Sequence, residues 1–206
     1  MTQRTKKIST HGAKNESEIK SPMKATEKAL VIALTALTYT ALYLLNAKLD
    51  AFFSVSEHVS WIYMPSGLML FFVLLFMELG AVGIVLASLW ISSHYLTSND
   101  WFVLIGGSLI SGFAPLLARK ICIDKLQLDM NLSNLTAGTL LKVAAIFSVM
   151  SAVLHQLLFT WRALTTDFVG QTAVMAVGNF TGTLIVLYIA KLALHYFMPQ
   201  QTSTKE

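Results

Sequence analysis

The residues of this chain with the most potential for chemistry are polar side chains inside otherwise apolar stretches. His155 and Gln156 lie together in one such stretch, and Asn179 lies in another. Polar groups at membrane depth are costly and mark either functional sites or hydrogen bonds between helices. Histidine titrates near neutral pH, so His155 could sense protons or donate to a ligand. The alternative is a structural hydrogen bond between helices, worth about 0.6 kcal/mol on average.

A second candidate is the segment from Trp61 to Gly67, which contains Pro65, Ser66 and Gly67. Proline suits the first turn of a helix. A helix starting at Pro65 has 13 residues before Glu78, or about 20 Å, which is too short to cross a bilayer. The preceding residues then enter the membrane as irregular backbone, which is tolerated only inside protein or beside a wet cavity.

We therefore predict a ligand or signal pocket in the outer half of the membrane. Its candidate residues are Trp61, Pro65, Ser66, Gly67, His155, Gln156 and Asn179. The alternative at Pro65 is an ordinary proline-started helix under a close-fitting outer loop.

Six stretches without Asp, Glu, Lys or Arg must position these residues. They run from Ala29 to Ala47, Val59 to Met77, Leu79 to Asn99, Trp101 to Ala118, Val143 to Trp161, and Phe168 to Ala190. Each is close to the roughly 20 residues that a helix needs to cross a bilayer. The sequence predicts an all-α, polytopic membrane bundle of six transmembrane helices, surrounded by lipid.

The distribution of charge predicts the topology. Seven basic residues precede the first stretch, and only Lys48 and Arg162 fall on the opposite side if the amino terminus is inside. This bias follows the positive-inside rule and places both termini in the cytoplasm. We expect a disordered basic tail over residues 1–28, a membrane domain over 29–197 and a short tail over 198–206. The cytoplasmic loop from Arg119 to Lys142 is the other polar segment.

Small residues spaced four apart predict close contacts between helices. The pairs are Gly83 with Ala87, Gly107 with Ser111, and Gly178 with Gly182.

Catalysis is not predicted. Gly106 to Leu109 begins like the Gly-x-Ser-Gly motif of rhomboid proteases but lacks its final glycine. Ser108 and His195 fall at opposite membrane depths and so cannot form a nucleophile–base pair. The helices carry no paired carboxylates and the chain has no His-Glu-x-x-His motif, so we predict no metal, no cofactor and no nucleic-acid partner. Cys122, the single cysteine, is expected to be an inert thiol.

Two segments resemble a known family. The segment from Trp61 to Gly67, with the apolar run to Gly83, and the segment from Val177 to Val186 resemble the first type of membrane-associated sensor domain (the MASE domains). The resemblance implies a sensory domain of bacterial signalling proteins in the inner membrane, with Pro65, Gly67, Asn179 and Gly182 as sensing or structural positions. The chain departs from the family in having six helices and no output domain, so it would be a free-standing version acting through a partner.

The leading functional hypothesis is a non-enzymatic sensory or interaction module that acts through a membrane or cytoplasmic signalling partner. The rival is a small substrate-binding subunit of an energy-coupled vitamin or small-solute importer, for which Ala29 and Ala33 would provide a docking face. A third hypothesis is an assembly protein without a ligand.

Overall fold

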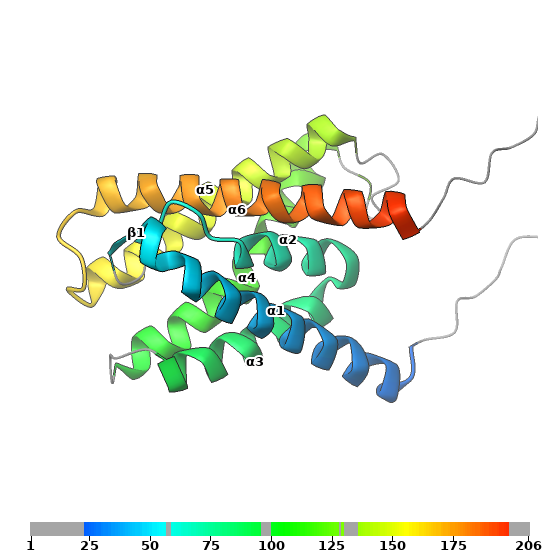
Figure 1. Cartoon of the computed structure of the whole chain (residues 1–206), viewed down its shortest axis with the longest axis horizontal. Coiled ribbons are helices and arrows are strands. Elements are labelled where there is room, and N and C mark those ends of the chain that lie inside the picture. Colours follow the sequence, from blue (N-terminus) through cyan, green and yellow to red (C-terminus); the bar gives the residue numbers. More distant parts are fainter. Residues whose placement is uncertain (1–22, 57–58, 96–99, 128, 130–135, 198–206) are drawn as a thin grey trace, which may run out of the picture.

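The computed structural model describes residues 23–56, 59–95, 100–127, 129 and 136–197. This part of the chain is helical apart from one short hairpin (Figure 1). The elements are α1 (Ala25–Phe53), β1 (Ser54–Ser56), β2 (Val59–Ser60), α2 (Pro65–Phe76), α3 (Glu78–Tyr95), α4 (Trp101–Leu126), α5 (Ala137–Trp161) and α6 (Phe168–Phe197). The all-α prediction is confirmed.

Four helices in the described part are long and apolar enough to cross a membrane. These spans are Ala25–Asp50, Trp101–Lys125, Ala137–Trp161 and Phe168–Ala193. α2 is a shorter apolar helix, and α3 is not among the four. The chain is therefore compatible with an integral membrane protein by the length and composition of its helices.

Several helices extend beyond the charge-free stretches that predicted them. α1 begins at Ala25, inside the predicted tail, and continues through Lys48 and Asp50 to Phe53. α4 includes the first part of the predicted loop and ends at Leu126, and α5 begins at Ala137. These helices therefore continue past the charged residues that bound the charge-free stretches. The tails 1–22 and 198–206 lie outside the described residues.

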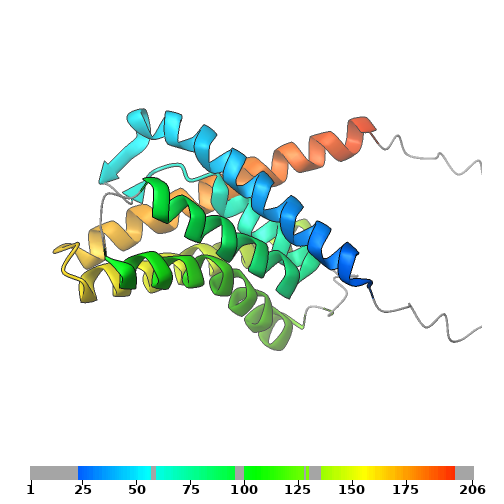
Figure 2. The ribbon, with the colours of Figure 1, turned by 90° about the horizontal axis from the view of Figure 1, so that it is seen from below.

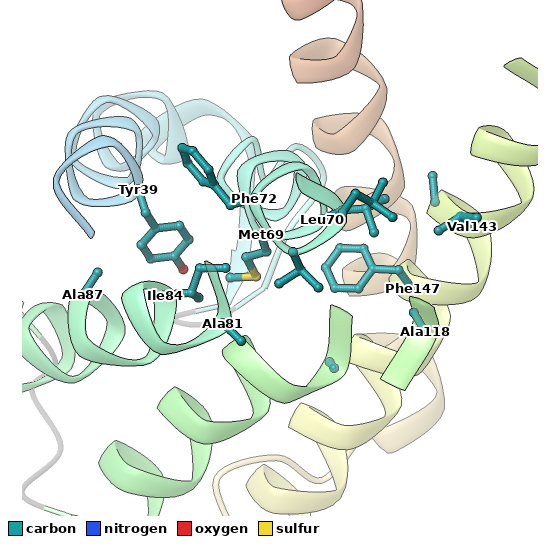
Figure 3. Close-up of a cluster of buried hydrophobic side chains, with 14 of the residues drawn as sticks. Tyr39, Met69, Leu70, Phe72, Ala81, Ile84, Ala87, Ala118, Val143 and Phe147 are labelled. Carbon is teal, nitrogen blue, oxygen red and sulfur yellow. The ribbon is translucent and has the colours of Figure 1, made fainter. Parts of the chain in front are cut away.

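α2 is the centre of the bundle. Eight of its 12 residues are buried, and it contacts α1, α3, α4, α5 and α6. Figure 3 shows Met69, Leu70 and Phe72 of α2 surrounded by side chains of the neighbouring helices. The labelled neighbours are Tyr39, Ala81, Ile84, Ala87, Ala118, Val143 and Phe147. The short helix therefore fixes the positions of the longer ones.

A single residue, Met77, joins α2 to α3. Its φ of 50° turns the chain, and α3 begins at the next residue, Glu78. A Cβ at Gly80 would lie 2.5 Å from the Phe72 carbonyl oxygen, so this position needs glycine. The tight connection predicted at Glu78 to Gly80 lies one residue earlier, at Met77, and Glu78 to Gly80 form the first turn of α3.

Successive helices alternate in direction along the long axis of the molecule, so the start of α1 and the end of α6 lie at the same end (Figure 1). Seen from below, α4 is bent along its length (Figure 2). Pro115 lies inside this helix and is buried. A proline removes one backbone hydrogen bond and crowds the preceding turn, which accounts for the bend.

Candidate ligand cavity

A cavity of about 710 Å³ lies between the helices. All six helices, the hairpin and the segment before α2 contribute to its wall. Its polar lining residues are Tyr43, Asp50, Ser54, Ser60, Tyr63, Ser88, Ser92, Ser111, Ser151, His155 and Asn179. Its apolar lining residues include Met69, Ile91, Val103, Phe159 and Met175. Ligand sites are typically cavities of roughly 300–1,000 Å³ with a few converging polar groups, so this space is suited to a small molecule.

His155 lines the cavity from α5 and is 8% exposed. Its Nδ1 lies 2.8 Å from the Ser151 carbonyl oxygen, which can only accept a hydrogen bond. Nδ1 therefore carries a proton, and in the neutral ring Nε2 is an acceptor. Nε2 lies 3.5 Å from Ser111 Oγ of α4, at the long limit of a hydrogen bond. The imidazole is thus held in one orientation by its own helix.

Asn179 lines the cavity from α6 and is 2% exposed. Its side-chain nitrogen is buried and has no hydrogen-bond partner among the described residues. A buried amide without a partner is destabilising by about 1–3 kcal/mol. No hydrogen bond within the described part of the chain uses this donor.

Asn46 and Asp50 of α1 form a polar pair that was not identified from the sequence. Asn46 Nδ2 donates to Asp50 Oδ1 at 3.0 Å, and Asn46 Oδ1 accepts from the Met64 backbone N–H at 3.0 Å. Asn46 therefore holds the irregular segment before α2 against α1. An asparagine near the end of an apolar stretch, four residues before an aspartate, was the available signal.

Residues Trp61 to Met64 lie outside α2, as the sequence predicted for a helix starting at Pro65. The Tyr63 hydroxyl lies 3.2 Å from the Tyr39 hydroxyl of α1. The Tyr63 backbone N–H donates to the Gly178 carbonyl oxygen of α6 at 3.0 Å. The irregular backbone is thus bonded to protein on two sides.

Ser66 and Gly67 lie at the contact between α2 and α6, and Pro65 is the buried first residue of α2. None of the three lines the cavity. Ser66 Oγ lies 2.7 Å from both the Tyr63 and the Asn179 carbonyl oxygens. A Cβ at Gly67 would lie 2.5 Å from Val186 Cβ. These residues therefore position Asn179 by holding its helix close to α2.

Trp61 and Gln156, also predicted for the pocket, do not line it. Trp61 is 47% exposed, and its carbonyl oxygen accepts from Thr181 Oγ1 of α6. Gln156 is fully buried, and its Nε2 donates to the sulfur of Met175, a lining residue, at 3.8 Å. Of the seven predicted pocket residues, the structure brings His155 and Asn179 to the cavity wall.

The small-residue pairs differ in what surrounds them. A Cβ at Gly178 or Gly182 would lie 2.0 Å from a carbonyl oxygen, of Ser60 and Tyr63 respectively. A Cβ at Gly83 would lie 2.7 Å from Thr35 Cβ of α1, and Ala87 on the next turn is buried in the core cluster. These are close helix contacts, as predicted.

Gly107 does not make the close helix contact that was predicted for it. A Cβ there would meet nothing within 4 Å, and Gly107 lines the cavity together with Ser111. Ser111 Oγ donates to the Gly107 carbonyl oxygen at 2.9 Å. The small residues at these two positions of α4 face open space, so their size sets the cavity volume.

An ion pair at one end of the bundle joins α4 to α5. Arg162 Nε lies 2.6 Å from Asp100 Oδ2, and the guanidinium group lies over the rings of Phe102 and Trp161 at 5.1 and 5.4 Å. The hydrogen bond from Arg162 lowers the pKa of the Asp100 carboxyl group. Asp100 also accepts from the Phe102 backbone N–H and so caps α4.

Groups for metal binding do not gather in the described part of the chain. Three or more His, Cys, Asp or Glu side chains do not converge there on any metal-sized site. Ser108 Oγ donates to the Leu104 carbonyl oxygen of its own helix at 2.7 Å. The side chain of His195 lies outside the described residues.

No protein-family model, curated protein or solved structure matches this chain. What the cavity does must therefore be inferred from its own residues.

Proposed function

We propose that this chain is a non-enzymatic membrane module that binds a small ligand in the cavity and reports its binding to a signalling partner. The observation that carries the proposal is the Asn179 amide, a buried donor without a described partner in the wall of a cavity of about 710 Å³. A ligand that accepts from this amide removes a destabilising feature of the empty state.

Contacts between distant segments support a coupling of the cavity to the bundle. The two segments that resemble the sensor-domain family, Trp61 to Gly67 and Val177 to Val186, lie against each other through Ser66, Gly178 and Gly182. They enclose Asn179. A ligand that shifts Asn179 would displace α6 relative to α2, to the extent that it binds the two arrangements differently.

The proposed topology has six crossings and both termini in the cytoplasm. Alternating helix directions, and the shared end for the start of α1 and the end of α6, support an even number of crossings. The excess of basic residues outside the spans supports the cytoplasmic side. α2 and the irregular segment before it would cross together, because α2 alone has only 12 residues, or about 18 Å.

The test uses a variant that occupies the cavity without disturbing the packing. Gly107→Leu places a side chain in the open space beside Gly107, and Ile105→Leu on the exposed side of α4 is the matched control. The tagged chain is purified with its partner from host membranes, and the activity of the partner is compared across the variants. We expect Gly107→Leu to change that activity and Ile105→Leu to leave it at the wild-type level. Equal partner activity with wild type, Gly107→Leu and Ile105→Leu would overturn the proposal.

The importer hypothesis remains a second candidate because Ala29 and Ala33 are both exposed on α1. Small residues on an exposed helix face allow another helix to approach closely. Co-purification discriminates between the two: an ATPase complex supports transport, and a histidine kinase or a cyclic-di-GMP enzyme supports sensing.

A further inference from the structure

The charge of the cavity wall comes from one carboxyl group. Among the described residues that line the cavity, Asp50 is the only Asp, Glu, Lys or Arg. Its hydrogen-bond donors Asn46 and Ser60 are both neutral, and the ion pair between Arg162 and Asp100 does not involve it. A partly buried carboxylate without a basic partner attracts a cation more strongly than it would in water.

Aromatic rings line the same cavity. Tyr43 lies seven residues before Asp50 on α1, which places the two on one face of the helix two turns apart. Tyr63 and Phe159 contribute further rings. The face of an aromatic ring attracts cations, by roughly 0.5–2 kcal/mol depending on solvent exposure. The wall therefore combines a carboxylate with the ring types that favour a cation.

A second polar feature comes from α6. The Asn179 side-chain nitrogen is a buried donor without a described partner. A ligand that satisfies it must carry a hydrogen-bond acceptor in addition to its charge.

We propose that the ligand is a small organic amine, bound as a cation by Asp50 and through a hydrogen-bond acceptor by Asn179. This inference rests on the proposed function, and it adds the chemical class of the ligand. It disfavours carboxylic acids as ligands, because they would place a second negative charge beside Asp50 in a wall whose described residues include no Lys or Arg.

Three compounds of nearly equal shape test the class. Tyramine, tyrosol and 4-hydroxyphenylacetate share a phenol that can accept from Asn179 and differ in an ammonium, hydroxyl or carboxylate terminus. Binding of each to the full chain in lipid nanodiscs is measured by calorimetry. We expect tyramine to bind at least about tenfold more tightly than tyrosol, and 4-hydroxyphenylacetate to bind most weakly.

The variant Asp50→Asn separates charge from shape. Its side-chain oxygen can still accept from Asn46, so the contact that holds the segment before α2 is retained. We expect it to lose the preference for tyramine over tyrosol. Asp124→Asn, at an exposed position of α4, removes one charge away from the cavity and should retain the preference.

The outcomes separate this inference from the proposed function. Equal binding of tyramine and tyrosol, a preference unchanged in Asp50→Asn, or tighter binding of the carboxylate would each overturn the amine class while leaving a ligand-binding cavity. Failure of all three compounds to bind would also overturn it, and the comparison of partner activity with Gly107→Leu would then decide the proposed function independently.

Discussion

At the scale of single residues, glycines with the same sequence spacing have opposite roles. Gly178 and Gly182 contact backbone carbonyl groups so closely that no side chain fits, whereas Gly107 faces the cavity. The spacing of four residues predicts which glycines share a helix face. It cannot predict whether that face meets another helix or an open space, because this depends on where the neighbouring helices lie.

This difference predicts opposite effects of alanine. Gly107→Ala should stabilise the chain by about 0.5–1 kcal/mol, because alanine restricts the unfolded chain and favours helix. Gly182→Ala should destabilise it by about 1–3 kcal/mol, because its Cβ would lie 2.0 Å from the Tyr63 carbonyl oxygen. Unfolding in mixed detergent micelles measures both, and a destabilised Gly107→Ala would contradict the assignment of Gly107 to open space.

Asn179 allows a second prediction at this scale. Asn179→Leu should raise the stability of the ligand-free chain by about 1–3 kcal/mol, because it removes a buried donor without a described partner. The same variant should bind tyramine more weakly. Thermal unfolding and calorimetry give the two values, with Ser93→Ala at an exposed position of α3 as the control. If Asn179→Leu is less stable than wild type, the prediction is wrong and the Asn179 side chain instead contributes to the packing of the bundle.

The candidate site was only partly predictable from the sequence. His155 and Asn179 were identified because polar residues stand out in apolar stretches, and both line the cavity. Asp50 was not a candidate because it lies beyond the charge-free stretch from Ala29 to Ala47. Ser66 and Gly67 were assigned to the pocket, but their contact with α6 depends on packing between segments more than 100 residues apart.

At the scale of elements, each charge-free stretch contains one helix, and proline and glycine mark the important irregularities. The break before Pro65 and the turn before Gly80 were both predicted, because each follows from a local backbone requirement. The hairpin of β1 and β2 was missed. Its strands have three and two residues and carry no alternating pattern long enough to be recognised.

The connection between α4 and α5 predicts a pH dependence. The pKa of Asp100 is lowered in the folded chain by Arg162, so the pair contributes stability above the unfolded pKa, which is about 3.9 for an aspartate. This contribution is lost as the pH falls through the lower, folded pKa. Wild type should therefore unfold at a higher temperature than Asp100→Asn at pH 7, and the difference should shrink as the pH falls below about 3.9.

Thermal unfolding in a nonionic detergent from pH 7 to pH 3 measures this difference. Asp124→Asn is the control, because it removes an exposed carboxyl group elsewhere on α4. A difference in unfolding temperature that stays constant across this range would contradict the prediction, because the ion pair with Arg162 would then not be its cause. Helix capping, which does not require a charged side chain, would explain it instead.

At the scale of the whole molecule, the open question is how the short α2 and α3 relate to the membrane. Six crossings place the turn at Glu78 on the same side as both termini. A re-entrant α2–α3 pair, with four crossings, places it within the membrane. Both arrangements put the termini together, so the position of Glu78 distinguishes them.

Cysteine labelling measures that position. In a Cys122→Ala background, Glu78→Cys should react with a charged maleimide only from the cytoplasmic side, because Glu78 is exposed in the folded chain. Ser54→Cys, in the exposed part of the hairpin, should react only from the opposite side. Labelling of position 78 from neither side would support the re-entrant arrangement.

The apolar spans of α1, α4, α5 and α6 have 25 or 26 residues, which corresponds to about 38 Å of helix. This exceeds the roughly 30 Å of hydrocarbon in an average bilayer, so the spans must tilt, bend or thicken the lipid around them. All four helices also line the cavity. Hydrophobic mismatch therefore acts on the shape of the binding site, and acyl-chain length becomes a variable that shifts ligand affinity without any change in the ligand.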